Sequence, residues 1–191
     1  MNNDNIEKQI FELLQEIDSF VGIPGFEHEE FILQALHEAI VAIKNNNFAI
    51  GAIITNSFGK IVAKGQNKVF NPYHRSDQHA EMNAVTNWEK KIANKLINLE
   101  PAYIFSTLEP CPMCLSRLLS SHVKCIYYAV PDEFGGMARK KENLPKIWKE
   151  FMKNRVIQEA NCSPKLKIYC KQIFELSDKK IEISGLWKEL K

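Results

Sequence analysis

Three residues whose side chains bind soft metal ions stand at the starts of predicted helices. Cys111 and Cys114 form a Cys-x-x-Cys pair with a proline on each side of the first cysteine, and His79 opens an earlier helix. A helix N-terminus lowers the pKa of a thiol toward the thiolate that a metal needs. Two sulfurs on one helical turn can face one tetrahedral ion, and an imidazole would add a third ligand. This spacing predicts a zinc site whose fourth position is open to water.

A carboxylate lies two residues after the histidine, at Glu81. From there it can face the same opening without completing the metal shell. Zinc with three protein ligands lowers the pKa of water from ~15.7 toward ~7. A carboxylate beside that water can carry protons to a substrate and later to its leaving group. Together with the metal site, Glu81 predicts hydrolytic chemistry at neutral pH.

The elements that must position these residues alternate between helix and strand. Apolar spacing predicts helices over 6–20, 32–43 and 79–95, one beginning near 111, and one over 144–154. Strands are predicted over 50–55, 61–64, 102–106, 125–130 and 155–158. Ser163 followed by Pro164 predicts the N-cap and first residue of a last helix. This order favours a mixed sheet covered by helices on both faces.

Composition sets broad limits on the chain. Its 191 residues, 45% of them hydrophobic, suffice for one substantial core, and a net charge of +2 does not imply a strongly charged partner. Five cysteines are an odd number, and no charged-then-apolar leader opens the chain, so a cytoplasmic protein without an oxidised framework is expected. No apolar run approaches the roughly 20 residues of a membrane helix, so no membrane partner is expected.

The motifs around the metal site resemble those of a known family. His79-Ala80-Glu81 and Pro110-Cys111-Pro112-Met113-Cys114 are similar to the H-x-E…P-C-x-x-C signature of zinc-dependent nucleobase deaminases, the cytidine/deoxycytidylate deaminase-like superfamily. Gly51-Ala52-Ile53-Ile54, Gly65-Gln66-Asn67 and Thr107-Leu108-Glu109 resemble the family's first strand, its substrate-side asparagine and its lead-in to the cysteines. Within the family, the sequence most resembles the branch of guanine deaminases and tRNA adenosine deaminases.

The resemblance covers about residues 31–159 and carries several expectations. It implies an α/β fold, a three-layer α/β/α sandwich with a five-stranded mixed sheet, that binds Zn²⁺ and forms a homodimer or larger homo-oligomer. It also implies that Asn67 hydrogen-bonds the substrate base and that the backbone N–H of Ala80 lies near a ring substituent. His74, in the loop before the histidine ligand, is a further candidate for substrate contact because of its place in the sequence.

Three segments are expected along the chain. Residues 1–28 form a helical N-terminal extension, residues 29–160 form the zinc deaminase domain, and residues 161–191 form a C-terminal helical extension packed on the same domain. Three further cysteines are expected in the core: Cys125, Cys162 and Cys170. Three further histidines are expected at the surface: His28, His37 and His122.

The leading interpretation is hydrolytic deamination of a small nucleobase, nucleoside or nucleotide, with release of ammonia. An alternative is deamination of adenosine in tRNA, because residues 107–111 and the start of the strand at Arg155-Val156 also resemble that branch. Residues 139–155, which are basic and contain aromatic residues, separately suggest a nucleic-acid partner. Against it, Ile147, Phe151 and Met152 predict a buried stripe, which would leave the basic residues on a solvated face. Two other classes stay open: a non-catalytic subunit that zinc only stabilises, and a metal-free dithiol redox protein.

Overall fold

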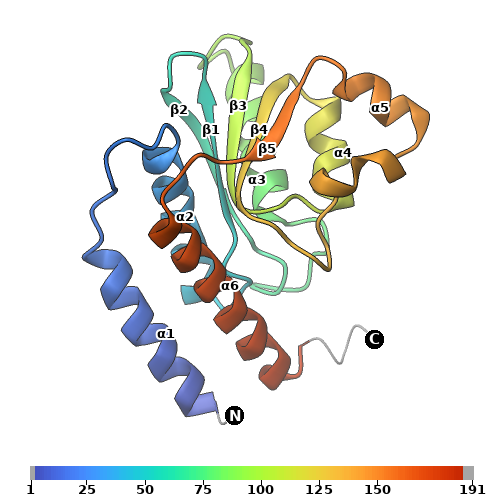
Figure 1. Ribbon diagram of the computed structural model, residues 1–191. Helices are drawn as coiled ribbons and strands as arrows, with labels where there is room; N and C mark the ends of the chain where they lie inside the picture. The colour runs from blue at the N-terminus through green and yellow to red at the C-terminus, as the bar shows by residue number, and fades with distance from the viewer. Residues whose placement is uncertain (1–2, 187–191) are drawn as a thin grey trace.

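A five-stranded mixed sheet lies between two layers of helices in the computed structural model, which describes residues 3–186 (Figure 1). The strands are β1 (Gly51–Asn56), β2 (Ile61–Gln66), β3 (Ala102–Leu108), β4 (Val123–Val130) and β5 (Val156–Glu159). Their order is β2-β1-β3-β4-β5. β1 is antiparallel to both of its neighbours, whereas β3, β4 and β5 are parallel. The predicted three-layer α/β sandwich is therefore confirmed.

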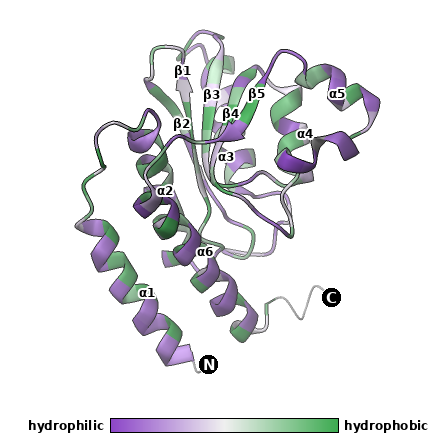
Figure 2. Cartoon of the chain, viewed as in Figure 1, coloured by the Kyte–Doolittle hydropathy of each residue, from purple (hydrophilic) through white to green (hydrophobic). Residues whose placement is uncertain are grey.

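The helices divide between the two faces of the sheet, and an apolar core lies between the sheet and each layer of helices. One layer contains α1 (Asn3–Asp18), α2 (Glu29–Lys44) and α6 (Pro164–Ser184); the other contains α3 (Ala80–Ala93), α4 (Pro112–Ser120) and α5 (Lys146–Met152), with a short 3-10 segment η1 (Ala138–Asn143) before α5. Hydrophilic and hydrophobic residues alternate along the helices (Figure 2), as expected of helices that bury one face. Among residues 3–186, no helix has both the length and the apolar character needed to cross a membrane.

The first and last helices pack against each other. Four residues at helical spacing form the buried side of α1: Ile6, Ile10, Leu13 and Ile17. Lys180 near the end of α6 pairs with Glu7 near the start of α1, so the two helices run antiparallel. Ser163 caps α6 as predicted, since its Oγ accepts a hydrogen bond from the N–H of Leu166 at 3.2 Å. Residues 1–2 and 187–191 of the two expected extensions lie outside the described residues.

Strand register brings the metal-binding candidates to one edge of the sheet. The start of β1 pairs with the ends of its neighbours, Gly51 with Gln66 and Ala52 with Ser106. Because α3 follows β2 and α4 follows β3, both helices begin at this edge. Gly65 lets α3 lie directly on β2, since a Cβ there would overlap the backbone of Ala80 and Ala84. This close contact fixes the start of α3.

The predicted surface position of His28 is wrong. Its side chain is buried at 4% exposure and its ring centroid lies 4.1 Å from that of Tyr127. Its Nδ1 accepts a hydrogen bond from the N–H of Asn161 at 2.9 Å. The charged sequence neighbours of His28 suggested exposure, but the segment between β5 and α6 covers it. Cys162 and Cys170 are buried as predicted, whereas Cys125 is only partly buried.

The predicted buried stripe of α5 is wrong for Ile147 and Phe151, two of its three residues. Ile147 is 55% exposed and Phe151 is 43% exposed. Met152, the third residue of the stripe, faces the core as predicted, together with Trp148, and both are partly buried against it. The apolar residues of this short helix form two adjacent rows with a spacing of four residues. The sequence does not distinguish them because both rows have helical periodicity.

Candidate active site

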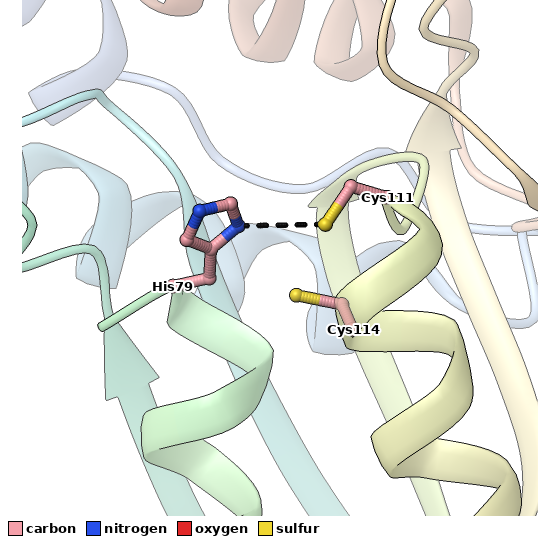
Figure 3. A group of neighbouring side chains, drawn as sticks. All are labelled: His79, Cys111 and Cys114. Atoms are coloured by element: carbon pink, nitrogen blue, oxygen red, sulfur yellow. Dashed lines mark hydrogen bonds between the residues drawn. The ribbon is translucent and has the colours of Figure 1, made fainter. Parts of the chain in front are cut away.

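The three predicted metal ligands lie together at the starts of two helices. His79 is the N-cap residue of α3 and Cys111 is the N-cap residue of α4, and neither side chain caps its own helix. Cys114 lies one turn into α4. Figure 3 shows the three side chains pointing toward one another, and their ligand atoms all lie within 4.8 Å of each other. The side chains are therefore free to share one ion.

The spacing of these atoms fits zinc. Bond lengths of about 2.3 Å to sulfur and 2.0–2.1 Å to nitrogen place the two atoms about 3.6 Å apart in a tetrahedral site. The Sγ of Cys111 lies 3.6 Å from Nδ1 of His79. Two thiols and one imidazole are also a donor set that zinc prefers. The three residues are positioned to bind zinc.

The two thiols differ in acidity because they share a hydrogen bond. That bond, between Cys114 and Cys111, and a further one with His79 outweigh burial and lower the pKa of Cys111 to about 4. The same bond with Cys111, together with burial, raises the pKa of Cys114 well above its ordinary value. The hydrogen bond with Cys111 also raises the pKa of His79. Without metal, Cys111 is a thiolate and Cys114 keeps the proton that zinc would displace.

Glu81 lies beside the ligand group and is buried at 3% exposure. Its Oε1 accepts a hydrogen bond from Ser106 Oγ at 3.2 Å, and its Oε2 accepts one from Cys114 Sγ at 3.4 Å. Burial raises the pKa of the Glu81 carboxyl group, with the Cys111 thiolate adding to the effect. A carboxyl group with a raised pKa is suited both to accept and to return a proton.

A cavity of about 750 Å³ opens over these residues and is lined by His79, Glu81 and Cys111. Its size lies within the range of small-molecule sites. Much of the remaining wall is apolar, and three of its aromatic residues are Phe48, Phe70 and Phe174. The cavity therefore suits a flat, partly apolar molecule that lies against the metal-binding residues and Glu81.

Two of the three predicted substrate-binding residues, Asn67 and His74, line the cavity, and Ala80 does not. Asn67 lines it and is 1% exposed; its Oδ1 accepts the N–H of Val69 at 3.1 Å. Its buried Nδ2 has no partner among the described residues, so it has a donor to offer. His74 lines the cavity as well. Ala80 is buried and does not line it, but its N–H is among those at the start of α3 that no helical carbonyl satisfies.

A buried carboxylate ties the loop of Cys111 to the loop that follows β4. Both oxygens of Glu109 accept hydrogen bonds from Arg139, one from its backbone N–H at 2.8 Å and one from its Nε at 2.9 Å. The N–H of Asp132 donates to the second oxygen at 3.0 Å. Burial alone would raise the pKa of Glu109, but these hydrogen bonds outweigh it and hold the pKa below its ordinary value.

Sequence reasoning missed the residues that other segments add to the cavity wall. Phe174 and Asp178 come from α6, and Phe134 comes from the loop after β4. The apolar periodicity of α6 indicates that one side of the helix is buried. It does not indicate that the middle of the helix borders the cavity of the metal-binding residues, because that depends on how α6 packs across the sheet.

Comparison with known proteins identifies the family. Residues 26–130, more than half of the chain, match the model for the cytidine and deoxycytidylate deaminase zinc-binding region. The chain belongs to this family. Its members are zinc-dependent enzymes that act on C–N bonds, and the matched residues include the three ligand candidates and Glu81.

Relatives within the family have different named substrates. A tRNA-specific adenosine deaminase of Bacillus subtilis is 31% identical over 118 residues, which cover 62% of this chain and 71% of the relative. A guanine deaminase of the same organism is 30% identical over 103 residues, covering 53% and 64%. The match to a chloroplastic tRNA(adenine(34)) deaminase of Arabidopsis thaliana spans 10% of that longer protein.

A solved structure shares the fold. The guanine deaminase from Nitrosomonas europaea aligns with a TM-score of 0.61 at 18% identity, over 87% of this chain and 92% of that one.

Proposed function

We propose that this family member is a hydrolytic deaminase of a small nucleobase, nucleoside or nucleotide and releases ammonia. One observation carries the proposal. Buried Glu81 lines the same cavity as His79 and Cys111 without belonging to the ligand group. Zinc held there would supply water that is activated at neutral pH. A structural zinc site has no need for such a carboxylate.

Glu81 would carry the protons of the reaction. As the oxygen of water bonds to the ring carbon that bears the amino group, the Glu81 carboxylate takes a proton from water and gives it to the adjacent ring nitrogen. The carboxylate then takes the hydroxyl proton and delivers it to the amino group. The C–N bond breaks, ammonia leaves, and a carbonyl remains on the ring. One carboxyl group can do this in turn because it acts first as a general base and then as a general acid.

We further propose that Asn67, Ala80 and His74 bind the substrate. The unpartnered Nδ2 of Asn67 is suited to donate to a ring nitrogen or carbonyl oxygen. The backbone N–H of Ala80, beside the metal-binding residues, is suited to a ring substituent. His74, whose ring centroid is 6.1 Å from that of Phe70, is suited to contact the substrate from the side of the cavity.

Deamination of adenosine in tRNA is the second candidate, and the Bacillus subtilis relative of that name favours it. The engagement of two arginines of the basic segment weighs against it. RNA binding needs Lys and Arg side chains that are free to meet phosphates. Arg139 instead pairs with Glu109 and Glu133, and Arg155 donates to two backbone carbonyls. These arginines of the basic segment are already engaged within the chain.

The test is an ammonia-release screen of the zinc-loaded protein with free bases, nucleosides, nucleotides and tRNA. Release from a small molecule supports the first candidate, and release from tRNA alone supports the second. Absence of release from all of them, with zinc bound, would make the protein a non-catalytic subunit. Elemental analysis of the same sample separates all three from a metal-free dithiol protein.

Replacing Glu81→Gln should lower turnover by at least the ~10²–10⁴-fold that general acid–base catalysis contributes. Zinc content should not change, because the glutamine keeps the size of the side chain and Glu81 is outside the ligand group. Glu89→Gln is the matched control, since Glu89 lies on the same helix with a side chain 44% exposed. Near-normal turnover in Glu81→Gln would remove Glu81 from the mechanism, and loss of zinc would make it a ligand.

We also propose that the protein is a cytoplasmic homo-oligomer, most simply a dimer, on the basis of its family. Light scattering tests the assembly. A mass near the 22.0 kDa of one chain at micromolar concentration would contradict it. Fractionation of the source cells tests the location.

A further inference from the structure

Phe134 is fully exposed, at 101% of its reference area, although it lines the cavity that contains the metal-binding residues. It lies in the loop after β4, beyond Val130. A large apolar ring at the wall of a cavity gains from being covered. Because no part of the described chain covers this ring, a molecule that enters the cavity is the group placed to do so.

The loop holds Phe134 in a defined position relative to the metal-binding residues. Oδ1 of Asp132 accepts hydrogen bonds from the N–H groups of Phe134 and Gly135, both at 3.0 Å. The N–H of Asp132 donates in turn to Glu109, which is two residues before Cys111. A short chain of hydrogen bonds therefore connects the backbone of Phe134 to the loop of a metal ligand.

Phe134 also stands between two cavities. A second cavity, of about 760 Å³, shares Phe134 and Leu108 with the first and extends along α6 past Lys167 and Lys171. The first cavity is lined by the metal-binding residues His79 and Cys111, and charged side chains of α6 line much of the second. A ring at their junction is placed to contact a molecule that extends from the first cavity into the second.

We propose that Phe134 is a substrate-binding residue whose ring stacks on the heterocycle held over the metal-binding residues. This proposal rests on the proposed function, which places a nucleobase in the first cavity. Every nucleobase has a π-face, and stacking on an aromatic side chain adds affinity without selecting one base. Any sugar or phosphate on the substrate then lies past Phe134, in the second cavity.

The test compares Phe134→Ala with Phe58→Ala, using the substrate found in the ammonia screen. Phe58 is also highly exposed, at 85%, but lies in the turn between β1 and β2 and does not line either cavity. Loss of stacking should raise KM about 5- to 150-fold in Phe134→Ala, with kcat within about threefold of wild type. Zinc content should be unchanged, Phe134→Tyr should restore KM, and Phe58→Ala should match wild type. A KM within about twofold of wild type in Phe134→Ala would overturn the proposal.

A second measurement does not depend on turnover. Phe134→Trp places a fluorescent ring at the same position, and Phe58→Trp is its control. Titration with adenosine, guanosine, cytidine and their free bases should quench Phe134→Trp saturably, with no saturable change in Phe58→Trp. Absence of quenching by all six compounds would overturn the stacking role. Ammonia release by the wild-type protein tests the proposed function separately, so the two failures are distinguishable.

Discussion

Glu109→Gln tests whether the buried carboxylate stabilises the loops that border the cavity. The side chain of Glu109 has 0% exposure, and its two oxygens accept three hydrogen bonds, two from Arg139 and one from Asp132. Glutamine offers only one oxygen, so its amide nitrogen must face at least one of these donors. The hydrogen bonds that remain also lose their charge.

The expected loss follows from these contacts. A hydrogen bond to a charged group is worth ~1.5–3 kcal/mol, and a neutral one ~0.5–1.5 kcal/mol. Losing one bond and weakening two should lower the free energy of unfolding by about 3–6 kcal/mol. Glu133→Gln is the matched control, because Glu133 pairs with the same arginine at 3.0 Å but its side chain is 74% exposed. That variant should stay within about 0.5 kcal/mol of wild type.

Urea unfolding followed by circular dichroism measures both variants. The difference in the free energy of unfolding between wild type and Glu109→Gln should also depend on pH. Because the folded protein lowers the pKa of Glu109, the carboxylate contributes its full stabilisation above the unfolded pKa of ~4.3 and loses it as the pH falls through the lower, folded pKa. This difference in free energy should therefore be constant between pH 6 and 8 and should become smaller below pH ~4.3. Equal stability of Glu109→Gln and Glu133→Gln at pH 7 would refute the reasoning.

Three further predictions follow from other contacts. Gly65→Ala should lower the free energy of unfolding by at least ~1–3 kcal/mol in urea, because the added methyl overlaps the backbone of α3; stability equal to wild type would contradict this close packing. Cys111→Ser should lose the stoichiometric zinc measured by elemental analysis and, like chelation of the wild type, abolish ammonia release; full zinc occupancy would exclude Cys111 as a ligand. Burial lowers the pKa of His28, so the unfolded chain binds the proton more readily and stability should fall as the pH drops below ~6.5. In urea titrations at pH 5.5 and 7.5, His28→Asn should lose this part of the pH dependence, and an unchanged dependence would assign it to other groups.

The sequence predicts the metal-binding group well because its determinants are local. His79 and Cys111 are N-cap residues, and the prolines around Cys111 fix the start of its helix. Apolar patterns likewise predict the main helices and the strands, since most of them bury at least one side, although β5 is largely exposed. What remains is to bring the two helix starts together, and the strand register achieves this through contacts far apart in the chain.

Long-range packing explains what the sequence does not predict. His28 has charged sequence neighbours, yet the segment before α6 covers it. Ile147 has helical spacing, yet the adjacent row of α5 faces the core. Phe134 and Phe174 reach the cavity from a loop and from the last helix, and no spacing relates them to the metal-binding motifs. Such positions depend on how whole elements pack together.

X-ray absorption at the zinc K-edge of the purified protein tests the central claim most directly. With His79, Cys111 and Cys114 as ligands, the spectrum should fit one zinc with two sulfurs at about 2.3 Å and two lighter atoms at about 2.0–2.1 Å. The lighter atoms would be one imidazole nitrogen and one oxygen from solvent. In Glu81→Gln the same shell should persist. A shell of four protein ligands, or of sulfur alone, would contradict a catalytic site at the starts of α3 and α4.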